Sequence, residues 1–314
     1  MSAKDALTAS AYTACWRAIR ALPAPAARGI FRLGADYAWR RNGGSVQRLR
    51  RNLARVLGHN LGAPPGPGHL EDAVRAGMRS YARYWLEAFR LPSLPTRAVL
   101  DGMVLENSEL LFDAVAAGRG VIGALPHSAN WDHAGAWACA QDLPLTTVAE
   151  RLKPESLYRR FVAYREGLGM EILPTSGGAQ PPLDILTSRL EQGRVVVLLA
   201  DRDLSSRGIE VNFFGGRTRM PAGPALLALR TGAPLLVVSL WYDDKILRAR
   251  IHPAVGVPSQ GNTREKLSAM TQAMADEFAH GIAAHPQDWH MMQRLWLERE
   301  RAAAADISSP GSPA

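Results

Sequence analysis

Short apolar segments alternate with amphipathic ones over most of this sequence, and this alternation constrains the fold more than any other feature. The first four apolar segments have the length of strands and lie at 121–125, 145–149, 170–173 and 195–200. Helical patterns at 129–141, 154–167 and 183–192 separate them. Such alternation builds a largely parallel central sheet flanked by helices on both faces, with its chemistry beyond the carboxyl ends of the strands. We therefore expect an α/β fold.

The same reasoning extends to both ends of this region. A helix is expected at 71–90, after the Pro/Gly-rich loop 60–70. Further strands are expected at 209–214, 235–241 and 246–252, and further helices at 222–231, 263–284 and 287–301. We expect one α/β domain over 61–301, an N-terminal amphipathic helical appendage over 1–60 and a disordered tail over 302–314.

Composition excludes several classes of protein. Only Cys15 and Cys139 are present among 314 residues, so the chain cannot form the disulfide framework of small secreted domains. No uncharged apolar run reaches the roughly 18 residues of a membrane span, and the N-terminus lacks the pattern of a secretion signal. We expect a cytoplasmic chain.

The excess positive charge lies in residues 1–60, which hold eleven basic and two acidic residues. Apolar residues recur there at helical spacing, at Tyr12, Trp16, Ile19, Ile30, Leu33 and Tyr37. Aromatic residues beside arginines are typical of a helix in the lipid headgroup layer. The alternative is a helix pair docked on the core with a solvated basic face, and the two can coexist. No motif supports binding to nucleic acid.

Several apparent motifs carry no chemistry. Gly118–Gly123 matches GxGxxG, but it precedes its strand instead of opening a helix, so we interpret it as a turn. The sequence has neither a P-loop nor a GxSxG nucleophile elbow. Its eight histidines are scattered, so we expect no metal site and no cofactor.

His127 is the strongest catalytic candidate. It follows the strand 121–125 by two residues, and Asp132 comes five positions later. A neutral imidazole at a sheet edge can take a proton from an alcohol, and a nearby carboxylate can fix its tautomer. The alternative is a histidine that caps the next helix, with Ser128 as the N-cap and an acid near the helix dipole.

A second group of polar residues follows the buried strand 195–200. Asp201 leaves this strand at the same expected edge and could be a second carboxylate on His127, or part of a salt-bridged loop. Candidates for phosphate binding are Arg202, Arg207, Arg217 and Arg219. Phe213 and Phe214 are interpreted as core residues. Arg165 could pair with Asp132 or donate to developing charge.

Taken together, these segments resemble the bacterial lipid A lauroyl/myristoyl acyltransferase-like superfamily, and most closely its actinobacterial phosphatidylinositol mannoside acyltransferases. The matching segments, in family order, are SYARYWLEAFR at 80–90, PHSANWD at 126–132, DRD at 201–203, NFFGG at 212–216 and HPQDWHMMQRLW at 285–296. The HxxxxD motif carries over to His127 and Asp132, and the later acid to Asp201, where glutamate is common in the mannoside branch.

The resemblance implies an acyl-CoA-dependent O-acyltransferase. It would move a long fatty acyl chain, with palmitoyl as the expected donor, to a mannose hydroxyl of a phosphatidylinositol mannoside. His127 would be the general base, supported by Asp132 and Asp201, without metal or cofactor. The N-terminus would hold the enzyme peripherally on the anionic cytoplasmic face of the plasma membrane. Two alternatives are acylation of another glycolipid by the same superfamily and a non-catalytic lipid-binding module.

Overall fold

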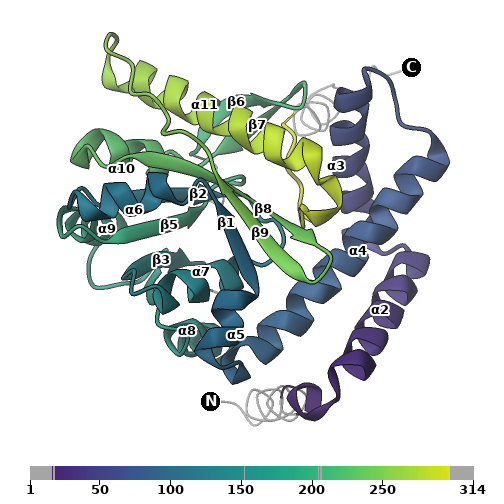
Figure 1. Cartoon of the computed structure of the whole chain (residues 1–314). Coiled ribbons are helices and arrows are strands. Elements are labelled where there is room, and N and C mark those ends of the chain that lie inside the picture. The colour runs from purple at the N-terminus through teal and green to yellow at the C-terminus, as the bar shows by residue number, and fades with distance from the viewer. Residues whose placement is uncertain (1–15, 17, 152, 204, 206, 298–314) are drawn as a thin grey trace, which may run out of the picture.

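A seven-stranded sheet forms the centre of the molecule (Figure 1). The computed structural model describes residues 16–297 except 17, 152, 204 and 206, and the sheet lies within this part of the chain. Its strands are β1 (Met103–Glu106), β2 (Val121–Leu125), β3 (Leu145–Ala149), β4 (Glu171–Pro174), β5 (Val195–Leu199), β8 (Leu235–Asp243) and β9 (Ile246–Ile251). Their order is β1-β9-β8-β2-β5-β3-β4, and β8–β9 is the antiparallel pair in an otherwise parallel sheet.

Strand β2 shows why both faces of the sheet are covered. Ile122 and Ala124 belong to one apolar cluster, and Val121 and Leu125 belong to another. Successive strand residues point to opposite faces, so a strand that is apolar throughout needs a layer on each side. The α/β fold that the sequence predicts is therefore confirmed.

Helices supply the two layers. The cluster with Ile122 takes most of its helical residues from α9 (Pro182–Glu191), α10 (Gly223–Thr231) and α11 (Thr263–Ala284), and Val56 of α3 (Gly44–Leu61) joins it. The cluster with Val121 takes them from α5 (Thr96–Asp101), α6 (Glu109–Ala116), α7 (Trp131–Ala140) and α8 (Glu155–Glu166). The hairpin of β6 (Ile209–Phe213) and β7 (Gly216–Met220) joins the first cluster, and Phe213 and Phe214 are buried in it as expected.

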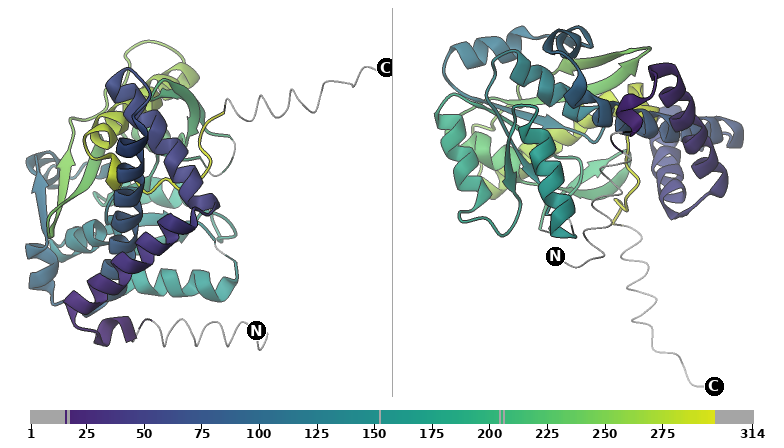
Figure 2. Two further views of the ribbon diagram at one scale, coloured as in Figure 1. Left: turned by 90° about the vertical axis from the view of Figure 1, so that its right-hand side faces the viewer. Right: turned by 90° about the horizontal axis from the view of Figure 1, so that it is seen from below.

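The N-terminal helices pack beside this core on α4 (Pro67–Arg90). Figure 2 shows α2 (Ala24–Arg41) and α3 (Gly44–Leu61) to one side of the sheet. Asp36 of α2 accepts hydrogen bonds from two arginines of α4, Arg75 and Arg79, and this pairing lowers the pKa of Asp36.

The N-terminal apolar residues fit the two interpretations in different parts of the chain. Trp16 and Ile19 pack against α4, and the Trp16 indole N–H donates to the carbonyl of Phe89 at 2.7 Å. Ile30, Leu33 and Tyr37 of α2 are instead 55%, 70% and 63% exposed. Tyr12 lies outside the described residues.

Three sequence-based expectations need correction. The helix predicted at 287–301 is absent from its described part: a 3₁₀ turn at Pro286–Asp288 leads into a non-helical segment up to 297. Residues 285–293, which include this turn and the start of the non-helical segment, are here called the strap. The strap pairs with the loop after β2 through the bridge between Ser128 and Trp289. Strands β1 and β7 were not predicted. Helix α7 begins at Trp131 with Asn130 as its N-cap, not Ser128.

No helix in the described ranges combines the length and apolarity needed to cross a membrane. The tail 302–314 lies outside these ranges, and the predicted domain boundaries stay predictions.

Candidate active site

His127 and Asp201 meet because their strands are parallel neighbours. Strands β2 and β5 pair with Leu125 opposite Leu199, so the residues two positions beyond each strand leave the sheet together. His127 Nδ1 lies 2.5 Å from Asp201 Oδ1, and the backbone N–H of His127 donates to Asp201 Oδ2 at 3.0 Å. Asp201, proposed from the sequence as a second carboxylate, is the acid in direct contact with the imidazole.

The environment of Asp201 favours its ionised form. Its side chain is wholly buried, and burial alone raises the pKa of a carboxyl. Attraction by the imidazolium form of His127 and the hydrogen bonds from His127 and Trp289 outweigh burial, so the pKa of Asp201 is lowered. An ionised carboxylate on Nδ1 places the proton there and leaves the lone pair on Nε2. The 29% exposed imidazole can therefore accept a proton at Nε2.

Asp132 faces other partners. Its Oδ1 accepts from Arg165 Nε at 2.7 Å, and its Oδ2 accepts from the Tyr84 hydroxyl at 2.9 Å. Among the described residues, Asp132 forms no hydrogen bond or ion pair with His127. The expected support of the imidazole by Asp132 is therefore not direct. The predicted pairing of Arg165 with Asp132 is confirmed.

The Asp132 pair is buried and charged. The Asp132 side chain is 3% exposed and that of Arg165 is 19% exposed. Burial by itself lowers the pKa of Arg165, but the Asp132 carboxylate more than reverses this effect and raises it, so Arg165 stays cationic. Burial together with the Asp132 charge raises the pKa of Tyr84, which keeps its hydroxyl protonated as a donor.

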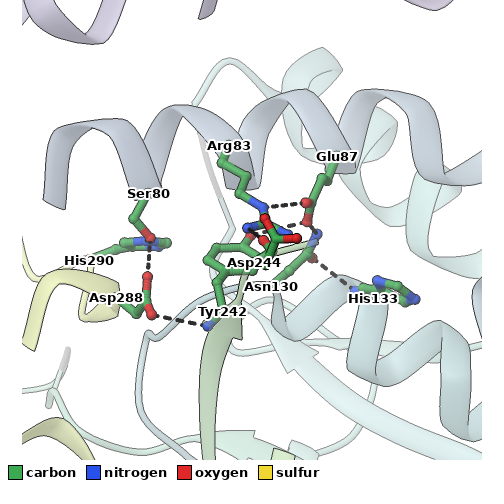
Figure 3. Close-up of polar contacts among 9 residues, drawn as sticks. All are labelled: Ser80, Arg83, Glu87, Asn130, His133, Tyr242, Asp244, Asp288 and His290. Atoms are coloured by element: carbon green, nitrogen blue, oxygen red, sulfur yellow. Dashed lines mark hydrogen bonds and ion pairs between the residues drawn. The ribbon is translucent and has the colours of Figure 1, made fainter. Parts of the chain in front are cut away.

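One face of α4 carries three side chains that hold different parts of the site. Ser80, Tyr84 and Glu87 are spaced by four and three residues, so they share this face. Figure 3 shows Ser80 pointing to the strap and Glu87 pointing to the loop after β2. Glu87 Oε2 accepts from Asn130 Nδ2 at 2.9 Å, and Asn130 Oδ1 in turn caps α7 by accepting from the backbone N–H of His133.

The strap closes the site from the other side. The N–H of His290 donates to the carbonyl of His127 at 2.8 Å, and the N–H of Ala129 donates to the carbonyl of Asp288 at 2.8 Å. The Ser80 hydroxyl lies 2.6 Å from Asp288 Oδ1 and 2.9 Å from His290 Nε2 (Figure 3). Burial, helped by the nearby His127, lowers the pKa of His290 to about 3, so this second histidine is neutral.

An open cavity of about 340 Å³ lies in front of His127. Its wall is largely aromatic and includes Tyr81, Trp85, Trp131, Tyr158 and Phe161. Polar groups that reach it include Arg165, Arg202 and Glu150. The cavity can therefore take a ligand with both apolar and anionic parts.

A second, narrow cavity of about 80 Å³ lies between the sheet and α7. Its wall is apolar and includes Leu125, Val197, Trp137 and Ile251. Trp131 lines both cavities. The narrow cavity offers nothing to a polar group, and its volume is far below the roughly 300 Å³ at which ligand pockets begin, so it is a packing space in the apolar core.

The structure separates the predicted phosphate-binding arginines. Arg202 and Arg165 line the cavity of His127, whereas Arg207 and Arg219 line another groove together with Arg264 of α11. Arg217 and Arg219 both pair with Glu210 across the β6–β7 hairpin. The four arginines therefore do not form one site.

Sequence reasoning did not single out Trp289, Tyr84 or Glu87. The signal that could have found them is their position inside SYARYWLEAFR and HPQDWHMMQRLW, the two segments of the resemblance that had no assigned chemistry. In the part of the chain that the structure describes, no group of three or more histidine, cysteine or acidic side chains is arranged to hold a metal ion.

A histidine paired with a carboxylate at the carboxyl edge of an α/β sheet, beside a largely aromatic cavity, is an arrangement suited to acyl transfer. The family model of the bacterial lipid A biosynthesis acyltransferases matches residues 2–298, and the chain belongs to this family.

Two similar proteins give a more specific comparison than the family model does. The chain is 50% identical over 286 residues to a phosphatidylinositol mannoside acyltransferase of Mycolicibacterium smegmatis, which covers 91% of this chain and 90% of the relative. It is also 50% identical over 289 residues to a protein of the same name from Mycobacterium tuberculosis, covering 91% and 88%.

Proposed function

We propose that this protein transfers a long fatty acyl group, with palmitoyl as the expected chain, from acyl-CoA to a mannose hydroxyl of a phosphatidylinositol mannoside. The acceptor class follows the names of the two relatives, which match most of the chain. The observation that carries the proposal is the His127–Asp201 pair at a largely aromatic cavity that two arginines, Arg165 and Arg202, also line.

The proposed reaction needs one proton relay. His127 Nε2 takes the proton of the mannose hydroxyl as its oxygen attacks the thioester carbonyl, and Asp201 stabilises the imidazolium that forms. The tetrahedral intermediate then collapses with cleavage of the carbon–sulfur bond. CoA leaves as a thiolate that recovers the proton from His127. The thioester is already activated, so no acyl-enzyme is required.

Arg165 is our proposal for the oxyanion donor. The backbone N–H groups of His127, Ser128 and Ala129 already donate to Asp201, Pro126 and Asp288. Arg165 uses Nε for Asp132 and lines the cavity, and a fixed cation is effective at a developing negative charge. Asp132 and Tyr84 would therefore act through Arg165 by holding it in place.

In this proposal the open cavity receives the reacting parts of both substrates. The start of the fatty chain would lie on its aromatic wall, which places the thioester carbonyl beside His127. The pantetheine and the mannose would approach the same cavity, and Arg202, which pairs with Glu150, would contact a phosphate group. Arg207, Arg217 and Arg219 are further candidates for phosphates outside this cavity.

We also propose that α2 attaches the enzyme to the anionic cytoplasmic face of the plasma membrane. Its exposed Ile30, Leu33 and Tyr37 recur at steps of three and four residues, with Arg28 and Arg32 between them and beside them. An apolar stripe bordered by cations is typical of a helix that lies in the headgroup layer.

The decisive experiment incubates the purified chain with acyl-CoA of different chain lengths and a panel of inositol glycolipids. Release of CoA is followed together with the mass of the acylated product. We expect turnover that depends on a mannoside acceptor and falls to background in His127→Ala. Release of CoA without an acceptor would identify a thioesterase instead. Retention of more than about a tenth of the activity by a folded His127→Ala would exclude the base assignment.

A further inference from the structure

We propose that Trp289 is a positioning residue for the catalytic pair: its indole N–H fixes the Asp201 carboxylate so that Oδ1 is held for His127 Nδ1. This inference rests on the proposed function, because it assigns Trp289 to the same proton relay.

The hydrogen bonds of Asp201 divide between its two oxygens. Oδ2 accepts from Trp289 Nε1 at 2.8 Å and from the backbone N–H of His127 at 3.0 Å. Oδ1 accepts from His127 Nδ1 at 2.5 Å. The terminal torsion of an aspartate is soft, so a carboxylate needs such contacts to hold one orientation. With two donors on Oδ2, rotation of the carboxylate would break both contacts as well as the one to His127.

Trp289 is itself held rigidly. It is fully buried, and its ring packs against Phe213 and Phe214 with centroid distances of 5.9 and 6.4 Å. Its two neighbours hydrogen-bond the loop of the base: the carbonyl of Asp288 accepts from the N–H of Ala129, and the N–H of His290 donates to the carbonyl of His127. The segment 288–290 therefore holds the loop of the base by its main chain and the acid by the side chain of Trp289, so the two catalytic groups are positioned by the same short segment.

The test removes only the N–H. Trp289 is replaced by 3-benzothienylalanine, in which sulfur takes the place of the indole N–H with almost no change of shape. The matched control is the same replacement at Trp296, whose Nε1 donates to Asn52 Oδ1 at 2.9 Å, away from the catalytic pair. Both variants lose one indole hydrogen bond, and both are first compared with the wild type in thermal melting.

We expect kcat of the Trp289 variant to fall at least about tenfold while KM for acyl-CoA stays within about twofold, because the pair is misplaced but the cavity is intact. The Trp296 variant should keep the wild-type kcat. An unchanged kcat in the Trp289 variant, or an equal fall in both variants, would overturn the assignment.

A second measurement separates this inference from the proposed reaction and needs no substrate. In the wild type, the proton between His127 Nδ1 and Asp201 Oδ1 should give a far-downfield NMR resonance, since its acceptor is a wholly buried carboxylate. The Trp289 variant should lose this resonance or move it upfield, and the Trp296 variant should retain it. If the resonance persists unchanged in the Trp289 variant, Trp289 does not position the pair, whatever reaction the enzyme catalyses.

If the Trp289 variant fails to fold, the same contact can be tested through the indole N–H resonance of Trp289 in the natural chain. With ¹⁵N-labelled indoles, Asp201→Asn should shift the Nε1–H resonance of Trp289 and leave that of Trp296 in place. A Trp289 resonance that is indifferent to Asp201→Asn would contradict the proposal.

Discussion

Breaking the Asp132–Arg165 pair should cost much stability. Asp132→Asn conserves the shape of the side chain, and the Tyr84 hydroxyl keeps an acceptor. Arg165, however, remains charged and no longer has an anion at position 132 to compensate it. The side chains are 3% and 19% exposed, so water can compensate only partly. Removing one partner of a buried ion pair costs about 3–5 kcal/mol in the free energy of unfolding.

This cost converts to a measurable change in melting temperature. For a chain of this size the entropy of unfolding is roughly 0.66 kcal/mol per kelvin, so a loss of about 4 kcal/mol lowers Tm by about 6 °C. Differential scanning calorimetry measures it directly. Asp101→Asn is the matched control, since Asp101 pairs with Arg97 on the surface with side chains 63% and 86% exposed. Its effect should stay within about 0.5 kcal/mol.

The double variant Asp132→Asn/Arg165→Gln tests the reasoning further. Removal of both charges should restore at least about half of the lost stability, because the uncompensated cation is gone. The pairing account of Asp132 would be refuted by a Tm of Asp132→Asn equal to that of Asp101→Asn, or by additive losses in the double variant.

Two further predictions concern pH and membranes. His290 has a pKa of about 3 in the fold against an ordinary value of 6.5, so the unfolded state takes up the proton first, and stability falls as the pH drops from 6.5 toward 3. At pH 5 this group lowers the free energy of unfolding by about 2 kcal/mol. In urea titrations, His290→Gln should therefore lose about 2 kcal/mol less stability than the wild type between pH 7 and pH 5. A loss equal to that of the wild type would contradict the prediction. Replacement of Ile30, Leu33 and Tyr37 by serine should reduce flotation with anionic vesicles at least tenfold, whereas serine at the exposed Val257 should not; equal flotation of both variants would remove α2 from the membrane contact.

The sequence predicted the fold, and it placed the candidate site at the ends of two strands, because both follow from short-range patterns. Strand length and apolarity located β2 and β5, and the rule that chemistry follows the strand ends located His127 and Asp201. Adjacency of β2 and β5 was not predictable, since strand order is set by tertiary packing. It was therefore the structure that turned Asp201 from an alternative into the acid that contacts His127.

Two differences between the sequence-based expectations and the structure have a common physical cause. Asp132 is five residues from His127, but it begins a helix whose packing turns its carboxylate toward Arg165 of α8 and Tyr84 of α4. The residues after Gln287 have apolar side chains at helical spacing, yet their main chain pairs with the loop of His127 instead. Both outcomes depend on partners far along the chain, which a local pattern does not contain.

The most direct test of the account is the single-turnover rate of acyl transfer by Asp201→Asn. An amide in place of the carboxylate can donate to Nδ1, which moves the imidazole proton to Nε2 and removes the base. We predict a folded enzyme whose Tm lies within a few degrees of that of the wild type. Its single-turnover rate should lie at least about 10²-fold below the wild-type rate. A folded Asp201→Asn that transfers the acyl group within tenfold of the wild-type rate would contradict the His127–Asp201 relay.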